Sequence, residues 1–120
     1  MGKVMVVDDA YSDLQMMESI LKSAGHEVIS CADGEQLEEK MAAERPDVLL
    51  LDIILPKRNG YEILRSLKKD ERTKQTPVVV VSSKNQESDQ AWGKRQGADE
   101  YLPKPFTPEQ LLTAVRRFAR

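Results

Sequence analysis

The segment VLLLDIILP at residues 48–56 decides the fold, because four consecutive apolar side chains run directly into an aspartate, Asp52. A strand that is apolar without alternation is expected where helices cover both faces of a parallel sheet. Similar or weaker strand signals lie at residues 4–7, 28–30, 78–81 and 100–102. The sequence therefore predicts a parallel sheet of five short strands.

Apolar residues with helical spacing separate these strands. In the first such segment Leu14, Met17 and Leu21 share one face, with Ser12 as the expected N-cap and Gly25 as the expected stop. Further helices are expected around 37–41, after Asn59-Gly60, at about 87–96, and from Pro108 to the chain end. The alternation predicts an α/β fold with helices on both faces of one sheet, in a single domain spanning residues 1–120.

Composition narrows the class of protein. The chain has 120 residues, of which 40% are hydrophobic and 32% charged, and its formal net charge is −2. This balance argues against intrinsic disorder and against a basic nucleic-acid-binding surface. The longest apolar run is too short for a membrane span, and a single cysteine, Cys31, cannot form an internal disulfide. We therefore expect a cytoplasmic protein with neither a nucleic-acid nor a membrane partner.

Charged and hydroxyl side chains follow four of the predicted strands. Asp8 and Asp9 follow the first strand, Asp52 the third, Ser82 the fourth and Lys104 the fifth. The carboxyl ends of parallel strands meet at one edge of the sheet, where α/β proteins bind their ligands. Three carboxylates in one place need compensating charge, which Lys104 and a hard divalent cation such as Mg²⁺ would supply. One carboxylate is then free to attack phosphorus and form an aspartyl phosphate.

Asp52 is the expected nucleophile, because it stands alone after the most hydrophobic strand, whereas Asp8 and Asp9 are adjacent. Taken singly, the Asp8-Asp9 pair is more simply explained as a helix cap and Asp52 as the start of a turn. The agreement of five positions in chain order favours the phosphoryl-transfer site.

The chain from Lys3 to Arg120 resembles a bacterial response-regulator receiver domain, which has the fold of the chemotaxis protein CheY. The motifs that carry the resemblance are Val7-Asp8-Asp9, the run 52–56, Asn59-Gly60, the apolar strand ending at Ser82, and residues 101–105. The resemblance implies a flavodoxin-like (βα)5 fold with strand order 2-1-3-4-5. It also implies a phosphoacceptor signalling switch rather than a conventional enzyme.

The resemblance assigns a role to each residue of the site. Asp52 would accept a phosphoryl group from a phosphohistidine on a histidine kinase or phosphotransfer protein. Asp9, Asp52 and the backbone carbonyl of Ile54 would ligate Mg²⁺ or Mn²⁺, and Asp8 would hold a metal-bound water. Lys104 would pair first with Asp52 and then with the phosphoryl group.

The same resemblance implies a route to a partner. Ser82 would move inward to the phosphoryl group, Tyr101 would turn inward after it, and the Lys104–Pro105 peptide bond would be cis. The surface of the fourth helix, fifth strand and fifth helix, including Trp92 and Arg116, would then control a downstream protein effector. Packing against a neighbouring element remains the simpler explanation of Trp92. We expect a monomer or weak dimer.

The segment 82–98 is similar to receivers of the twitching-motility system, the PilH type, and to cyanobacterial single-domain regulators. This likeness predicts a chemotaxis-type, CheA-like kinase as phosphodonor. A phosphate sink and a receiver cut from a longer regulator stay open, whereas the intact acidic set and Lys104 count against a pseudo-receiver that is never phosphorylated. A haloacid-dehalogenase-type phosphatase is disfavoured by Ile54, and a flavodoxin-like cofactor carrier by Asp8-Asp9. His26, in the loop before the second strand, is expected at the surface.

Overall fold

Five strands and five helices alternate along the chain in a computed structural model that describes residues 2–119. The strands are β1 (Lys3–Val7), β2 (Glu27–Cys31), β3 (Val48–Leu51), β4 (Val78–Ser82) and β5 (Glu100–Pro103). The helices are α1 (Tyr11–Ser23), α2 (Leu37–Glu44), α3 (Gly60–Lys69), α4 (Glu87–Arg95) and α5 (Pro108–Arg116). Every strand predicted from the sequence is present.

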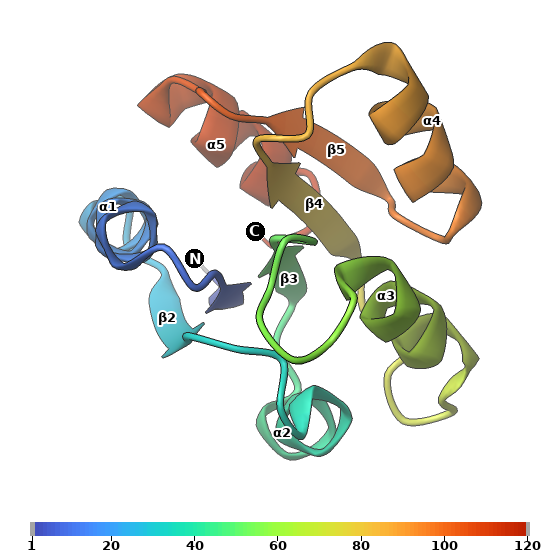
Figure 1. Cartoon of the computed structure of the whole chain (residues 1–120). Helices are drawn as coiled ribbons and strands as arrows, with labels where there is room; N and C mark the ends of the chain where they lie inside the picture. The colour runs from blue at the N-terminus through green and yellow to red at the C-terminus, as the bar shows by residue number, and fades with distance from the viewer. Residues whose placement is uncertain (1, 120) are drawn as a thin grey trace.

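The strands form one sheet in the order β2-β1-β3-β4-β5, and every pairing is parallel. Helices α1 and α5 lie on one side of the sheet, and α2, α3 and α4 lie on the other (Figure 1). The expected fold class and strand order are confirmed.

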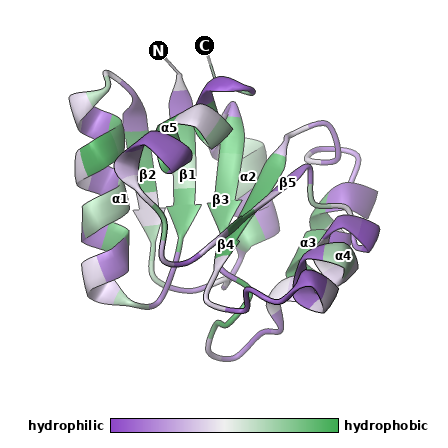
Figure 2. Cartoon of the chain, turned by 90° about the horizontal axis from the view of Figure 1, so that it is seen from above, coloured by the Kyte–Doolittle hydropathy of each residue, from purple (hydrophilic) through white to green (hydrophobic). Residues whose placement is uncertain are grey.

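The sheet is apolar on both faces, as the uninterrupted strands predicted. Within β1, Val4 and Val6 pack with α1 and α5, whereas Met5 and Val7 pack with α2 and α3. Figure 2 shows the hydrophobic strands of the sheet between helices that carry both hydrophobic and hydrophilic residues. The apolar strand residues therefore divide between two separate cores, one on each face of the sheet.

The connection from β3 to α3 is fixed by two residues. The Asn59 side chain caps α3 by accepting a hydrogen bond from the Tyr61 N–H at 2.8 Å. A Cβ on Gly60 would lie 2.2 Å from the Cα of Ile53, so only glycine fits there. The loop that follows Asp52 is thereby pressed against the start of α3.

Three expectations from the sequence are wrong in detail. Ala10, not Ser12, is the N-cap of α1, and it makes no side-chain capping bond. Helix α5 ends at Arg116 rather than at the chain end. His26 is buried, with 8% of its surface exposed, and its Nδ1 accepts a hydrogen bond from the Gly2 N–H at 3.1 Å, which holds the ring beside the residue that precedes β1. Among the described residues, no helix is long and apolar enough to cross a membrane.

Candidate functional site

Parallel pairing brings the predicted site residues to one edge of the sheet. Val7 pairs with Leu51, so the residues that follow them, Asp8 and Asp52, are neighbours across the β1–β3 junction. Ser82 ends β4 opposite Pro103 of β5, which places Lys104 immediately beyond. The four strand ends therefore converge without help from a long loop.

Three carboxylates form an acidic cluster at this edge. Ligand oxygens of Asp8, Asp9 and Asp52 lie within 4.8 Å of one another. Asp8 is fully buried and Asp52 is 6% exposed, whereas Asp9 faces solvent. Carboxylate oxygens at this spacing suit a hard divalent cation such as Mg²⁺, which takes oxygen ligands and keeps several waters. The donor set thus fits the metal that the sequence predicted.

Local backbone bonds orient the two buried carboxylates. The N–H of Ala10 donates to Asp8 Oδ1, and the N–H of Ile54 donates to Asp52 Oδ1, both at 2.9 Å. Burial raises the pKa of Asp8 even though hydrogen bonds from Lys104 and Ala10 act against the rise. Each of these aspartates therefore keeps its second oxygen for another partner.

That other partner is Lys104. Its ammonium donates to Oδ2 of Asp8 at 2.7 Å, of Asp13 at 2.8 Å and of Asp52 at 3.1 Å. Burial disfavours the charged ammonium, but its hydrogen bonds to Asp13 and Asp8, together with the negative charges of Asp52 and Asp8, outweigh burial and raise the pKa of Lys104. The lysine therefore stays charged at neutral pH.

Asp13 was missed in the sequence analysis. It does not follow a strand but lies in the first turn of α1, four residues beyond Asp9. The sequence did contain one signal for Asp13: it is an acidic residue in the first turn of α1, the helix that begins shortly after Asp8 and Asp9. An acidic first turn is so common, because of the helix dipole, that it did not point to the site.

Ser82 and Tyr101 meet at the backbone of one residue, Lys84. Ser82 is fully buried, and its hydroxyl accepts a hydrogen bond from the Lys84 N–H at 3.3 Å. The Tyr101 hydroxyl donates to the Lys84 carbonyl at 2.5 Å, and Tyr101 is only 7% exposed. The tyrosine ring is thus turned inward, and the segment after β4 connects it to the serine.

The remaining predicted residues lie around this centre. The Lys104–Pro105 peptide bond is cis. Trp92 in α4 is 45% exposed and makes an edge contact with Tyr61, the ring centres being 6.4 Å apart. It is therefore both packed on a neighbouring helix and open to solvent. Arg116 is exposed in the last turn of α5.

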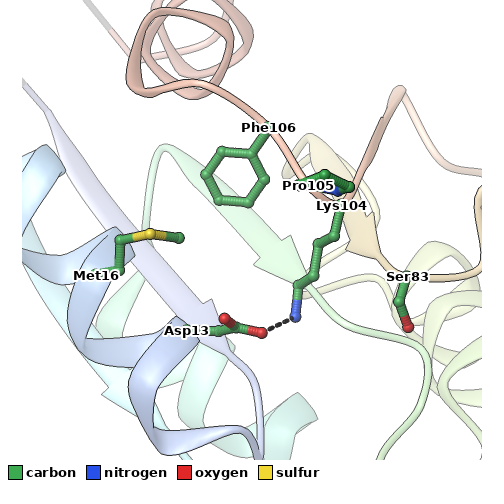
Figure 3. A pocket seen from close by; sticks show the side chains of 6 residues that line it. All are labelled: Asp13, Met16, Ser83, Lys104, Pro105 and Phe106. Atoms are coloured by element: carbon green, nitrogen blue, oxygen red, sulfur yellow. Dashed lines mark hydrogen bonds and ion pairs between the residues drawn. The ribbon is translucent and has the colours of Figure 1, made fainter.

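A pocket of about 470 Å³ opens beside Lys104. Figure 3 shows Asp13 and Met16 of α1 on one side, with Pro105 and Phe106 of the β5–α5 connection opposite them. The Lys104 side chain reaches between these walls to Asp13 (Figure 3). A molecule in solvent can therefore reach Lys104 through this pocket, along α1.

Known proteins are similar to this chain in sequence and in fold. The family model of the response regulator receiver domain matches residues 4–116. Protein PilH of Pseudomonas aeruginosa is 39% identical over 115 residues, covering 96% of this chain and 95% of that protein. The chemotaxis response regulator CheY4 of Vibrio cholerae is 35% identical, with a TM-score of 0.89 over 98% of both chains. The receiver domain of the Pseudomonas aeruginosa sensor histidine kinase PA1611, solved with magnesium in its active site cleft, is 26% identical, with a TM-score of 0.89 over 98% of this chain and 96% of that one.

The family match and the acidic cluster agree with each other. Receiver domains take part in phosphoacceptor signalling, interact with histidine kinases and are not conventional enzymes. The cluster of Asp8, Asp9 and Asp52 is typical of the magnesium site in such domains. This chain, a CheY-like α/β protein with an acidic pocket at the carboxyl edge of its sheet, therefore belongs to the response regulator receiver domain family of two-component signalling.

Proposed function

We propose that Asp52 is the phosphoacceptor of a signalling switch formed by residues 1–120 as one domain. One observation carries the proposal: Asp52 is a buried carboxylate held between a cluster of oxygen ligands and the ammonium of Lys104. Asp8 also contacts Lys104, but it has no exposed surface for an incoming group, whereas Asp52 is 6% exposed; Asp9 is open to water. Nucleophile and positive charge are thus already together.

The donor is a phosphohistidine on a histidine kinase or phosphotransfer protein. An Asp52 carboxylate oxygen forms the new O–P bond while the N–P bond of the phosphohistidine breaks. The electron pair of that bond returns to the imidazole, which then takes a proton from water. Lys104 stabilises the negative charge of the transferring phosphoryl oxygens. Asp8, Asp9, Asp52 and the carbonyl of Ile54 would hold Mg²⁺ or Mn²⁺, which would neutralise charge during the transfer.

The signal leaves the site through Ser82 and Tyr101. A phosphoryl group on Asp52 attracts the Ser82 hydroxyl. Because this hydroxyl accepts a hydrogen bond from the Lys84 N–H, a shift of Ser82 moves the Lys84 backbone, whose carbonyl accepts the hydrogen bond from the Tyr101 hydroxyl. The face of α4, β5 and α5, with Trp92, Tyr101 and Arg116, then changes shape and controls a protein effector. This is a local charge event that biases a two-state element.

The likeness to Protein PilH supports a role in type IV pilus motility or related chemotaxis-like signalling. On this proposal the donor is a CheA-like kinase, the domain acts in the cytoplasm as a monomer or weak dimer, and the effector is a protein. Phosphotransfer from purified kinases of several classes tests the pathway. Efficient transfer from other classes but none from the chemotaxis type would overturn it.

Intact mass after incubation with acetyl phosphate and Mg²⁺ tests the phosphoacceptor. The wild type should gain one phosphoryl group, and a chelator should prevent the gain. Asp52→Asn should gain none. Asp33→Asn is the matched control, because Asp33 lies outside the cluster and accepts from the Glu35 N–H, which asparagine can still do. A phosphoryl group on Asp52→Asn, or uptake that survives chelation, would contradict the proposal.

A further inference from the structure

The ammonium of Lys104 has no free donor. An ammonium carries three N–H groups, and each points to a different carboxylate: Asp8, Asp13 and Asp52. The Lys104 side chain is also only 13% exposed. A phosphoryl oxygen can therefore bind Lys104 only after one of the three carboxylates lets go.

Asp52 gives up its own bond to Lys104 when it takes the phosphoryl group, and of the two other carboxylates Asp13 is the better placed to release the ammonium. It lies outside the cluster of Asp8, Asp9 and Asp52, so a divalent cation in that cluster does not need it. Its side chain is 37% exposed, whereas the side chains of Asp8 and Asp52 are 0% and 7% exposed. It also lines the pocket beside Lys104, which leaves room for it to rotate (Figure 3).

Asp13 nevertheless binds Lys104 firmly. The distance of 2.8 Å from Asp13 to the ammonium is shorter than the 3.1 Å from Asp52. A charge-assisted hydrogen bond is about twice as strong as a neutral one. The negative charge of Asp13 also repels an approaching phosphoryl group, which is itself an anion.

We propose that Asp13 is a positioning residue that competes with the phosphoryl group for Lys104 and so limits the affinity of the site for phosphoryl groups. The inference rests on the proposed role of Asp52 and adds a residue to it. In the resting state Asp13 holds the ammonium toward α1. When a phosphoryl group occupies the site, Asp13 gives up its bond and turns into the pocket.

The test measures equilibrium binding of beryllofluoride, a phosphoryl mimic, in the presence of Mg²⁺. Trp92 fluorescence, or calorimetry if the fluorescence does not change, reports the binding. Asp13→Asn keeps the shape and the acceptor oxygen but loses the charge, so its apparent dissociation constant should fall by about three- to tenfold. Most of the gain should persist in 1 M salt, because salt screens a direct contact to a side chain that is only 13% exposed much less than it screens separated surface charges. Asp13→Glu, which restores the carboxylate, should return most of the way to the wild type.

Glu27→Gln is the matched control, since it removes one negative charge from an exposed residue at the opposite end of the sheet. It should bind beryllofluoride like the wild type. Equal affinity of Asp13→Asn and Glu27→Gln, with normal binding by the wild type, would overturn the inference and leave Asp52 as the phosphoacceptor. A wild type that neither binds beryllofluoride nor gains a phosphoryl group would overturn both.

Discussion

Gly93 leaves the space that the inward Tyr101 ring occupies. It is a buried residue in the middle of α4, a position where glycine is about 1 kcal/mol less stable than alanine. A Cβ at Gly93 would lie 2.8 Å from Cδ2 and 2.9 Å from Cε2 of Tyr101. Such contacts are too short, so Gly93→Ala must push the ring outward or shift α4.

The two effects of Gly93→Ala have opposite signs. Alanine should stabilise the helix by about 1 kcal/mol, whereas overpacking against the Tyr101 ring should cost about 1–3 kcal/mol. The net change in the free energy of unfolding is a loss of about 0–2 kcal/mol. When Tyr101 is first replaced by alanine, the ring is gone and only the helical gain remains. The same substitution should then stabilise the protein by about 1 kcal/mol.

Urea unfolding of the double-mutant cycle measures this reversal. The four proteins are the wild type, Gly93→Ala, Tyr101→Ala and the double variant, and the coupling energy should be about 1–3 kcal/mol. Ala91→Gly, at an exposed position of the same helix, is the control. It should cost about 1 kcal/mol in both backgrounds.

A result that refutes the reasoning is equal stabilisation by Gly93→Ala with and without the tyrosine. The inward position of the Tyr101 ring would then not depend on the absence of a side chain at residue 93. A loss of stability in both backgrounds would also count against it, because backbone rather than the Tyr101 ring would oppose the added methyl group.

Three further predictions concern the fold and the metal. Bidentate hydrogen bonds from Arg58 lower the pKa of Glu38 from 4.5 to about 2. Because the pKa of Glu38 is lower in the folded than in the unfolded state, ionised Glu38 stabilises the folded state above pH 4.5. The advantage of the wild type over Glu38→Gln, about 3 kcal/mol at pH 7, should therefore disappear as the pH falls from 4.5 toward 2. Urea titrations at several pH values measure this, and a constant difference would contradict it. Gly60→Ala should destabilise by more than about 3 kcal/mol, because its Cβ meets the Ile53 backbone; an unchanged urea midpoint would contradict that reason. Mg²⁺ at 10 to 100 times its Kd should stabilise the wild type by about 1.4–2.7 kcal/mol in thermal unfolding, and Asp9→Asn should lose most of this gain.

The fold could be predicted from the sequence because the strands are unusually uniform. The run from Val78 to Val81 contains no polar residue that would mark an exposed face, so two-sided burial was the simple interpretation. The strand ends then placed the acidic residues without any knowledge of loop conformation. Both conclusions depend only on local pattern and on the geometry of parallel sheets.

Contacts that the sequence could not predict join residues from distant parts of the chain. The bond between Asp13 and Lys104 spans 91 positions, and the bonds of Glu38 to Arg58 and Ser66 span 20 and 28. Each depends on the rotation of a helix about its own axis, which the apolar pattern fixes only approximately. A charged residue at a helix surface therefore gives no sign of which loop it faces.

The apolar residues that stabilise the fold are different from the charged residues that form the candidate site. Each face of the sheet is closed by apolar side chains, so the core does not need Asp8 or Asp52. Their burial works against stability, since a carboxylate loses hydration and Lys104 is a single cation shared among three acids. Natural folds keep such local conflicts at functional sites. The unbalanced negative charge at this edge is therefore an argument for a ligand that brings positive charge, and the position of Asp52 within it is the argument for phosphoryl transfer.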